Sequence, residues 1–445
     1  MDVRKIILIV CDGMSDRAVK SLDGKTPLEY AHTPNLDKLA EIGCTGLLDI
    51  LSPGVPPGSD SAHLALFGYE PEKYYPGRGA IEALGANIPV EDGVLACRFN
   101  LSTVVEKKVS EGVTLIVKDR RAGRISSEDA RYLIECLQVK LNNFKDVKVK
   151  IIPNVEHRGI LVIEGEGLSG DVSDSDPHEV ESCVNRCEPL SNADNFQAAE
   201  RTANIINEIV KSSYFLLKEH DINRLRIKRG LPAANIILPR GAGLVKKVDP
   251  FFKVWGLKAA CIAKLALYKG VARYVGMDVY DVPEATGTVN TNVEAKFKMA
   301  VELLKKYDYV FVHVKGTDSA SHDRKPLEKV KMIEKIDSAF KIILDEIVLP
   351  GKTVVALTSD HSTSCELGIH IGDPPALAVY APDIVPDDVK QFNERAVLKG
   401  GLGRVKAVDL MKILLNYSCR AMEYGLKPNR ETRLYRSTEC SPLVI

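Results

Sequence analysis

The sequence predicts an α/β protein: a doubly wound, mostly parallel sheet that carries a smaller inserted α/β domain. The segments at residues 5–11, 309–315 and 353–357 are short and mainly apolar, which is typical of strands buried on both faces. Helical patterns alternate with such segments along the chain, as parallel strands require. Between residues 90 and 229 the pattern changes. We therefore expect one domain at residues 1–89 and 230–445 and an inserted domain at residues 90–229.

The composition narrows the class of protein. With 445 residues the chain is long enough for two domains with sizeable cores. Lys plus Arg and Asp plus Glu number 60 each, and this zero net charge argues against a nucleic acid or membrane partner. The first apolar run is too short for a signal peptide, and the ten cysteines have the irregular spacing of reduced thiols. We expect a cytoplasmic protein, and the sequence leaves its oligomeric state undecided.

Polar side chains follow each of the three buried strands. Asp12 comes after the first strand, Asp318 and His322 after the second, and Asp360-His361 after the third. Each case alone is compatible with a polar turn. However, ligands bind at the carboxyl ends of parallel strands, and a D-x-x-x-H spacing places both side chains on one helical face. The repetition favours one shared site.

Ser59 follows a loop rich in Pro and Gly and stands where a short helix begins, at about residue 60. A serine at this place commonly caps the helix and needs no other role. The functional interpretation is a nucleophile whose phosphorylated form is held by the amides of the helix N-terminus. The local sequence alone favours the capping role.

The inserted domain is rich in arginine. Its predicted strands (114–117, 147–152 and 159–163) alternate with helices at 127–141 and 195–219, and the basic residues cluster in the loops. Any one arginine is compatible with a solvated surface, whereas several together suit a small acid with phosphate and carboxylate groups. The candidates for substrate binding are Arg121, Arg124, Arg229 and Arg240. A polar segment from Asp174 through Asp176 to His178 has no role that the sequence assigns.

The candidate metal ligands combine imidazole and carboxylate groups. They are Asp12, Ser59, Asp318, His322, Asp360, His361 and His370. This mixture suits two ions of Mn, Zn or Co better than Ca or Mg alone, although Mg is possible. Two divalent ions carry more positive charge than three carboxylates neutralise, so the site would attract phosphate and stabilise the oxygens of a phosphoryl group in transfer.

The motifs in this order resemble those of the alkaline phosphatase superfamily, and more closely the archaeal-type cofactor-independent phosphoglycerate mutases. They are Asp12-Gly13, residues 57–63 (Pro-Gly-Ser-Asp-Ser-Ala-His), Asp318 with His322, Asp360-His361, His370, residues 75–80 and residues 121–125. The resemblance covers essentially the whole chain. Two contexts depart from it: Ser321 stands where a glycine is expected before His322, and residues 371–376 read Ile-Gly-Asp-Pro-Pro-Ala where Ser-Gly-Asp-Pro-Val-Pro is expected.

The resemblance implies an alkaline-phosphatase-like fold and a role for each matching residue. Ser59 would accept the phosphoryl group. Asp318, His322 and His370 would hold one metal ion, and Asp12, Asp360, His361 and Ser59 the other. The implied reaction, which belongs to glycolysis and gluconeogenesis, interconverts 3-phosphoglycerate and 2-phosphoglycerate through phosphoserine and needs no 2,3-bisphosphoglycerate.

Three alternatives are weighed against this function. The altered contexts allow a related phosphotransferase or phosphatase that acts on another small phosphorylated acid. A sulfatase is disfavoured because the C-x-P-x-R motif does not occur in the sequence. A non-catalytic binding protein that keeps the fold would not need every ligand-type residue, and all of them are present.

Overall fold

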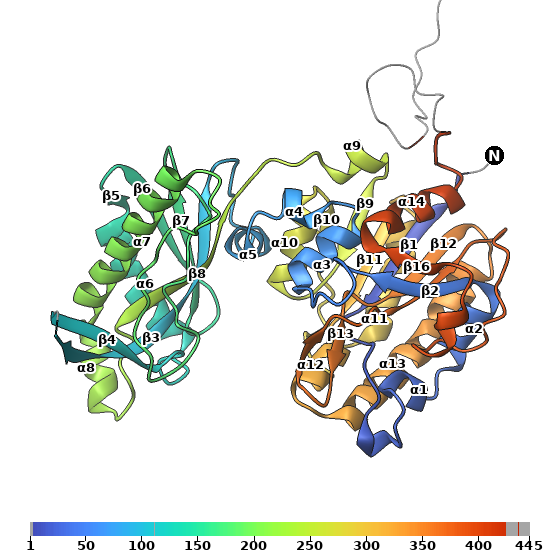
Figure 1. Ribbon diagram of the computed structural model, residues 1–445, viewed down its shortest axis with the longest axis horizontal. Helices are drawn as coiled ribbons and strands as arrows, with labels where there is room; N and C mark the ends of the chain where they lie inside the picture. The colour runs from blue at the N-terminus through green and yellow to red at the C-terminus, as the bar shows by residue number, and fades with distance from the viewer. Residues whose placement is uncertain (1–2, 111, 424–434, 436–445) are drawn as a thin grey trace, which may run out of the picture. The chain divides into compact units, whose positions relative to one another are not determined.

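The computed structural model describes residues 3–110, 112–423 and 435, and the chain forms two compact units (Figure 1). The first unit comprises the described residues of Met1–Tyr75 and Val248–Ile445, and the second comprises those of Pro76–Lys247. The boundaries expected from the sequence, after residues 89 and 229, lie inside the second unit. The difference arises because α5 (Arg78–Gly85) packs against the sheet of that unit and β8 (Ile236–Leu244) is one of its strands.

The first unit is built on a mixed, mostly parallel sheet. Within the described residues its strand order is β10-β9-β11-β1-β12-β15-β2-β16, and only β15 runs antiparallel to its neighbours. The strands are β1 (Lys5–Cys11), β2 (Cys44–Asp49), β9 (Ala259–Ile262), β10 (Asp278–Tyr280), β11 (Tyr309–Val314), β12 (Thr353–Thr358), β15 (Ala376–Tyr380) and β16 (Gly403–Lys406). The three strands expected from their apolar composition are neighbours, with β1 between β11 and β12 in parallel register.

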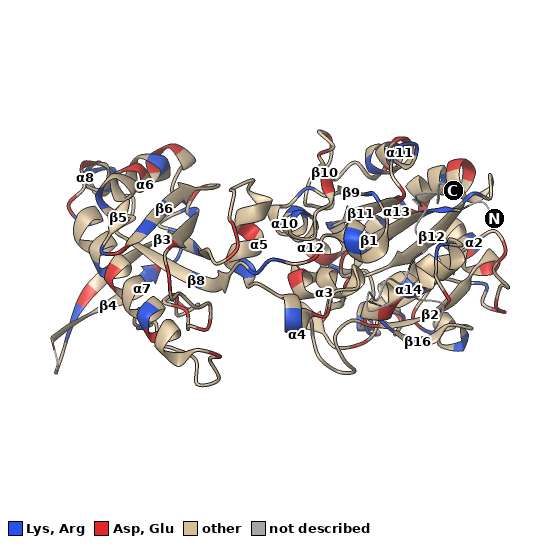
Figure 2. Ribbon diagram, turned by 90° about the horizontal axis from the view of Figure 1, so that it is seen from above, with Lys and Arg blue, Asp and Glu red and all other residues tan. Residues whose placement is uncertain are grey.

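Helices cover both faces of this sheet, which explains why its central strands are apolar on both sides. Helices α11 and α13 pack together with α2 on one face, while α3 and α14 pack on the other (Figure 2). The helices of the unit are α1 (Pro27–Tyr30), α2 (Pro34–Ile42), α3 (Ser59–Leu66), α4 (Pro71–Tyr74), α9 (Phe251–Trp255), α10 (Ala266–Tyr274), α11 (Val293–Leu304), α12 (Gly316–His322), α13 (Pro326–Ile343) and α14 (Ala407–Tyr417). A small hairpin of β13 (Ser362–Ser364) and β14 (Ile369–Ile371) lies beyond the end of β12.

The second unit has an antiparallel sheet of its own. Its longest strand, β3 (Leu95–Val109), pairs with β4, β7 and β8, and β6 and β5 continue the sheet beyond β7. The remaining elements are β4 (Gly112–Asp119), β5 (Asn143–Phe144), β6 (Val147–Pro153), β7 (Arg158–Glu164), α6 (Ser127–Leu141), α7 (Phe196–Leu217) and α8 (Asp221–Lys228). Alternate residues of β3 point to opposite faces. Leu95 and Cys97 therefore join a core with α6 and α7, while Ala96 packs with Ala80 and Ala83 of α5.

The predicted fold class is confirmed: an α/β protein with a mostly parallel sheet and a separate inserted module. The nine described cysteines are free thiols, and Cys440 lies outside the described residues. Among the helices in the described part of the chain, none has the length and apolar character needed to cross a membrane.

Candidate functional site

The carboxyl ends of three neighbouring strands bring three carboxylates together. Asp12 follows β1, Asp360 follows β12, and Asp318 lies in the first turn of α12 after β11. Because β11, β1 and β12 are adjacent and parallel, their ends meet at one edge of the sheet (Figure 1). At most 1% of each of these residues is exposed. A buried carboxylate requires a cation or strong hydrogen-bond donors, so three of them at this edge of the sheet favour the binding of a cation.

Ser59 is the first residue of α3 and not its cap. The N-cap is Gly58, in an extended conformation and without a side-chain cap. The Ser59 hydroxyl is buried and lies 3.2 Å from His361 Nε2, a residue 302 positions away in the chain. The structure therefore removes the capping interpretation of Ser59 and places its hydroxyl among the predicted metal ligands.

The first candidate half-site surrounds His361. Its Nδ1 lies 2.9 Å from Thr363 Oγ1, and Thr363 itself donates to Asp318 Oδ1 at 2.8 Å. His361 must therefore donate from Nδ1, which leaves a lone pair on Nε2. Nε2 lies 3.4 Å from Asp12 Oδ1 and 3.3 Å from Asp360 Oδ2. Both oxygens are buried and have no hydrogen-bond partner among the described residues. One nitrogen lone pair and two bare oxygens facing each other fit a cation.

The second candidate half-site surrounds Asp318. Its Oδ1 lies 3.3 Å from His322 Nε2 and 3.5 Å from His370 Nε2. The two Nδ1 atoms lie 2.8 Å from Gly368 O and 2.9 Å from Pro57 O, and a carbonyl oxygen only accepts. The two Nε2 atoms are 3.2 Å apart, so no more than one of them carries a proton. Backbone carbonyls thus fix both rings with Nε2 turned inward, as in many metal sites.

The charges of the site are unbalanced without a cation. Burial raises the pKa of Asp360 well above its ordinary value, and the neighbouring charge of Asp12 adds to this. Burial also raises the pKa of Asp12, but the Lys315 ammonium group, the hydrogen bond from His313 and the neighbouring His361 together keep that pKa below its usual range. Burial lowers the pKa of His361 to about 3, so this ring is neutral and can act as a ligand. The donor set fits Zn, Mn or Co.

All the predicted metal ligands lie together in the first unit. In the described residues, the donor atoms of Asp318, His361 and His370 lie within 4.8 Å of one another, as do those of Asp12, Asp360 and His361. His322 joins the first group through the contacts above, although 42% of its side chain is exposed.

Several polar residues around this centre were not among those predicted from the sequence. Lys315 Nζ lies 3.1 Å from Asp12 Oδ2 and 2.6 Å from Asp318 Oδ2, so its charge bridges the two half-sites. His313 also contacts Asp12, and His63 Nδ1 lies 2.6 Å from the carbonyl oxygen of Ser59. A usable signal for His313 and Lys315 was present: both are polar residues at the carboxyl end of an otherwise apolar strand.

A cluster of arginines lies in the second unit around buried Asp176. Arg120 donates to this carboxylate from Nε at 3.0 Å and from Nη2 at 2.7 Å, and Arg240 Nη1 lies 3.5 Å from it. Arg98 on β3 is directly opposite Arg240 on β8. Burial lowers the pKa of Arg240 to about 10, and the charge of Arg98 contributes. Arginines this close favour an anion beside them.

Of the four arginines predicted to bind substrate, only Arg240 contacts Asp176 in the described part of the chain. Arg240 belongs to the cluster. Arg121 is exposed and lies near His157, whose pKa is lowered by burial and by the charges of Arg158, Arg121 and Arg240. Arg124 and Arg229 are exposed, Arg124 in the turn before α6 and Arg229 at the end of α8.

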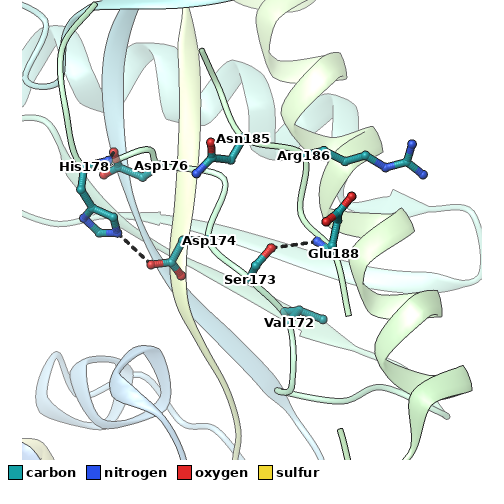
Figure 3. Close-up of a pocket in the computed structure, with 8 residues that line it drawn as sticks. All are labelled: Val172, Ser173, Asp174, Asp176, His178, Asn185, Arg186 and Glu188. Carbon is teal, nitrogen blue, oxygen red and sulfur yellow. Dashed lines mark hydrogen bonds and ion pairs between the residues drawn. The ribbon is translucent and has the colours of Figure 1, made fainter. Parts of the chain in front are cut away.

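The polar segment 174–178 lines a pocket of about 660 Å³ in the second unit (Figure 3). His178 Nε2 lies 2.9 Å from Asp174 Oδ2, and the other Asp174 oxygen accepts from the Gly241 amide at 2.7 Å. His178 has a φ of 64°, which is unusual for a residue with a side chain. The pocket lining also contains Asp176, so it adjoins the arginine cluster.

Comparisons with known proteins all find similarity to one family. The family model of 2,3-bisphosphoglycerate-independent phosphoglycerate mutase matches residues 40–223. A relative of that name from Ignicoccus hospitalis is 50% identical over 422 residues, which is 95% of this chain and 99% of the relative. One from Pyrococcus horikoshii is 44% identical over 423 residues, with 95% of this chain and 99% of the relative covered.

Two solved structures are similar to nearly the whole of this chain. A Pyrococcus horikoshii protein matches with a TM-score of 0.81 and 38% identity, covering 96% of this chain and 100% of the other. A cofactor-independent phosphoglycerate mutase from Thermoplasma acidophilum matches with a TM-score of 0.66 and 31% identity, covering 93% and 99%.

Proposed function

The chain belongs to the 2,3-bisphosphoglycerate-independent phosphoglycerate mutases, and we propose that it interconverts 3-phosphoglycerate and 2-phosphoglycerate through a phosphoserine at Ser59. The enzyme is an isomerase, and the family name states that 2,3-bisphosphoglycerate is not required. The observation that supports Ser59 is its hydroxyl, 3.2 Å from His361 Nε2 at the edge of the candidate metal centre. A cytoplasmic location is part of this proposal.

The proposed metal centre holds two divalent ions. One is assigned to Asp318, His322 and His370, and the other to Asp12, Asp360 and His361 with the Ser59 hydroxyl. When bound, such ions make a serine hydroxyl more nucleophilic and neutralise phosphoryl oxygens. Mn, Zn and Co are the candidates, because the donors are imidazole nitrogens and carboxylate oxygens.

The proposed reaction consists of two transfers of the phosphoryl group, first to Ser59 and then back to glycerate. In the first, a bond forms between Ser59 Oγ and phosphorus, the bond from phosphorus to the substrate oxygen breaks, and the serine proton ends on that oxygen. In the second, the other hydroxyl of glycerate attacks phosphoserine, and a proton returns to Ser59 Oγ. The side chain of His63, which holds the Ser59 carbonyl from the next turn of α3, supports the position of the nucleophile.

Glycerate must stay bound between the two transfers, since otherwise water would hydrolyse phosphoserine. We assign its carboxylate to the arginines of the second unit. Arg240 is supported by its place beside Arg98 and Arg120, while Arg121, Arg124 and Arg229 rest on the sequence alone. Guanidinium groups suit this role because their planar forks match a carboxylate.

The test is a product analysis with 3-phosphoglycerate and protein loaded with Mn²⁺. Mostly 2-phosphoglycerate with little free phosphate is the expected result. Ser59→Ala should abolish turnover, and acid quenching of the wild-type protein should trap phosphoserine at Ser59 for mass spectrometry. Ser61→Ala is the matched control, because Ser61 Oγ bonds only to the Gly58 carbonyl in the contacts described. Turnover by Ser59→Ala, or free phosphate as the main product, would contradict the proposal.

A further inference from the structure

The two carboxylate oxygens of Asp12 have opposite surroundings. Oδ2 accepts from Tyr268 Oη at 2.5 Å and from His313 Nε2 at 2.9 Å, and Lys315 Nζ lies 3.1 Å away. Oδ1 is buried, has no hydrogen-bond partner among the described residues and lies 3.4 Å from His361 Nε2. The asymmetry decides which oxygen remains available to an ion.

A carboxylate oxygen offers about two lone pairs, and three donors on Oδ2 use them fully. Asp12 therefore has only Oδ1 to give to a cation. We infer that Tyr268 and His313 are positioning residues that fix Asp12 so that it binds metal through Oδ1 alone. This inference rests on the metal centre proposed above and adds residues that do not themselves contact the ion.

Tyr268 and His313 act as one rigid unit. Their rings are stacked with centroids 3.6 Å apart and planes 25° apart, and both residues are almost completely buried. Tyr268 comes from α10 and His313 from β11, so two elements hold Asp12 at the end of a third. The backbone of His313 is also fixed, because the buried Lys296 donates to its carbonyl oxygen at 2.5 Å.

Removing one donor would leave Oδ2 held by two groups in place of three, so the Asp12 carboxylate would be fixed less firmly. The ion would then have to order its own ligand, and affinity would fall. Outer hydrogen-bond partners of metal ligands typically contribute about 10- to 100-fold to metal affinity. Because Tyr268 and His313 bond to Asp12 and not to Asp318, the loss should be confined to one of the two ions.

The test compares Tyr268→Phe with Tyr309→Phe. Tyr309 is also fully buried, and its hydroxyl has no hydrogen-bond partner in the described structure, so both variants lose one buried hydroxyl. Metal-free proteins are titrated with MnCl₂ by calorimetry and equilibrium dialysis. We expect Tyr268→Phe to weaken one Mn²⁺ site about 10- to 100-fold and Tyr309→Phe to weaken neither. The weakened site should be the one that Asp12→Asn loses.

A second pair of variants tests the other donor. His313→Gln keeps a nitrogen donor and should retain most of the affinity, whereas His313→Leu should lose it. This pair decides the matter if Tyr268→Phe does not fold. Wild-type Mn²⁺ affinity in Tyr268→Phe, or equal weakening of both sites by both tyrosine variants, would overturn the inference alone. Absence of Mn²⁺ binding by the wild-type protein would instead overturn the metal centre itself.

Discussion

Asp176 is the buried counter-ion of the arginine cluster, and Asp176→Asn removes its charge while keeping its shape. Arg120 Nε and the His178 amide both bond to Oδ1, which asparagine can retain. Oδ2 receives Arg120 Nη2 at 2.7 Å and lies 3.5 Å from Arg240 Nη1. Asparagine would turn an amide NH₂ group toward these two guanidinium donors, so two contacts become repulsive.

The expected cost follows from burial. Loss of a charge-assisted hydrogen bond costs about 1.5–3 kcal/mol, and breaking a fully buried ion pair costs about 3–5 kcal/mol. Here the carboxylate is fully buried, but the side chains of Arg120 and Arg240 are 26% and 15% exposed, so water partly screens them. We expect the free energy of unfolding to fall by about 2–3 kcal/mol. Because both guanidinium groups lose their orientation, we expect KM for 3-phosphoglycerate to rise about tenfold or more.

The control is Asp129→Asn. Asp129 Oδ2 lies 3.0 Å from Arg226 Nη1, and the two side chains are 29% and 4% exposed, so this partly buried pair lies in the same unit but outside the cluster. Urea unfolding followed by far-UV circular dichroism should show similar losses for both variants, whereas only Asp176→Asn should change KM. Equal destabilisation with wild-type KM in both would refute substrate binding by the cluster. Wild-type stability of Asp176→Asn would show that the ion pair does not stabilise the fold.

Three further outcomes are expected. Asp360→Asn should reduce the amount of bound metal, measured by elemental analysis. The same variant should raise the unfolding temperature of the metal-free protein, because it removes the repulsion between Asp360 and Asp12. A lower unfolding temperature would contradict this repulsion. Thr363→Val should weaken Mn²⁺ binding about 10- to 100-fold, because it removes the hydroxyl that links His361 to Asp318. The control Thr358→Val loses only a hydrogen bond to a backbone carbonyl and should not weaken Mn²⁺ binding. Burial raises the pKa of Asp176, but the hydrogen bonds from Arg120 and the His178 amide, with the charges of Arg120 and Arg240, together outweigh burial, so the net pKa is lowered. The stabilisation is therefore present above about pH 4 and lost as the pH falls through the folded-state pKa, so the difference in unfolding free energy between wild type and Asp176→Asn should shrink on acidification. A difference in unfolding free energy that persists in acid would contradict stabilisation by the ionised Asp176.

The central strands and the polar residues at their ends could be predicted from the amino-acid sequence. The apolar runs that became β1, β11 and β12 are buried on both faces, and such strands have a composition that is visible without a structure. Local spacing was equally informative for Asp318 and His322, which share α12. Helix α6 begins and ends at the residues expected from its pattern, because it lies between clear turn signals.

The contacts between side chains from distant parts of the chain could not be predicted in this way. Ser59 and His361 are 302 positions apart, and no local pattern shows that their side chains approach to 3.2 Å. Arg98 and Arg240 face each other because β8 returns beside β3, a pairing that periodicity does not reveal. The same holds for Tyr268 and His313 on Asp12. Periodicity records which face of an element is buried, whereas the partners of a buried polar group are set by long-range packing, since each such group must find its hydrogen bonds wherever the chain brings a donor.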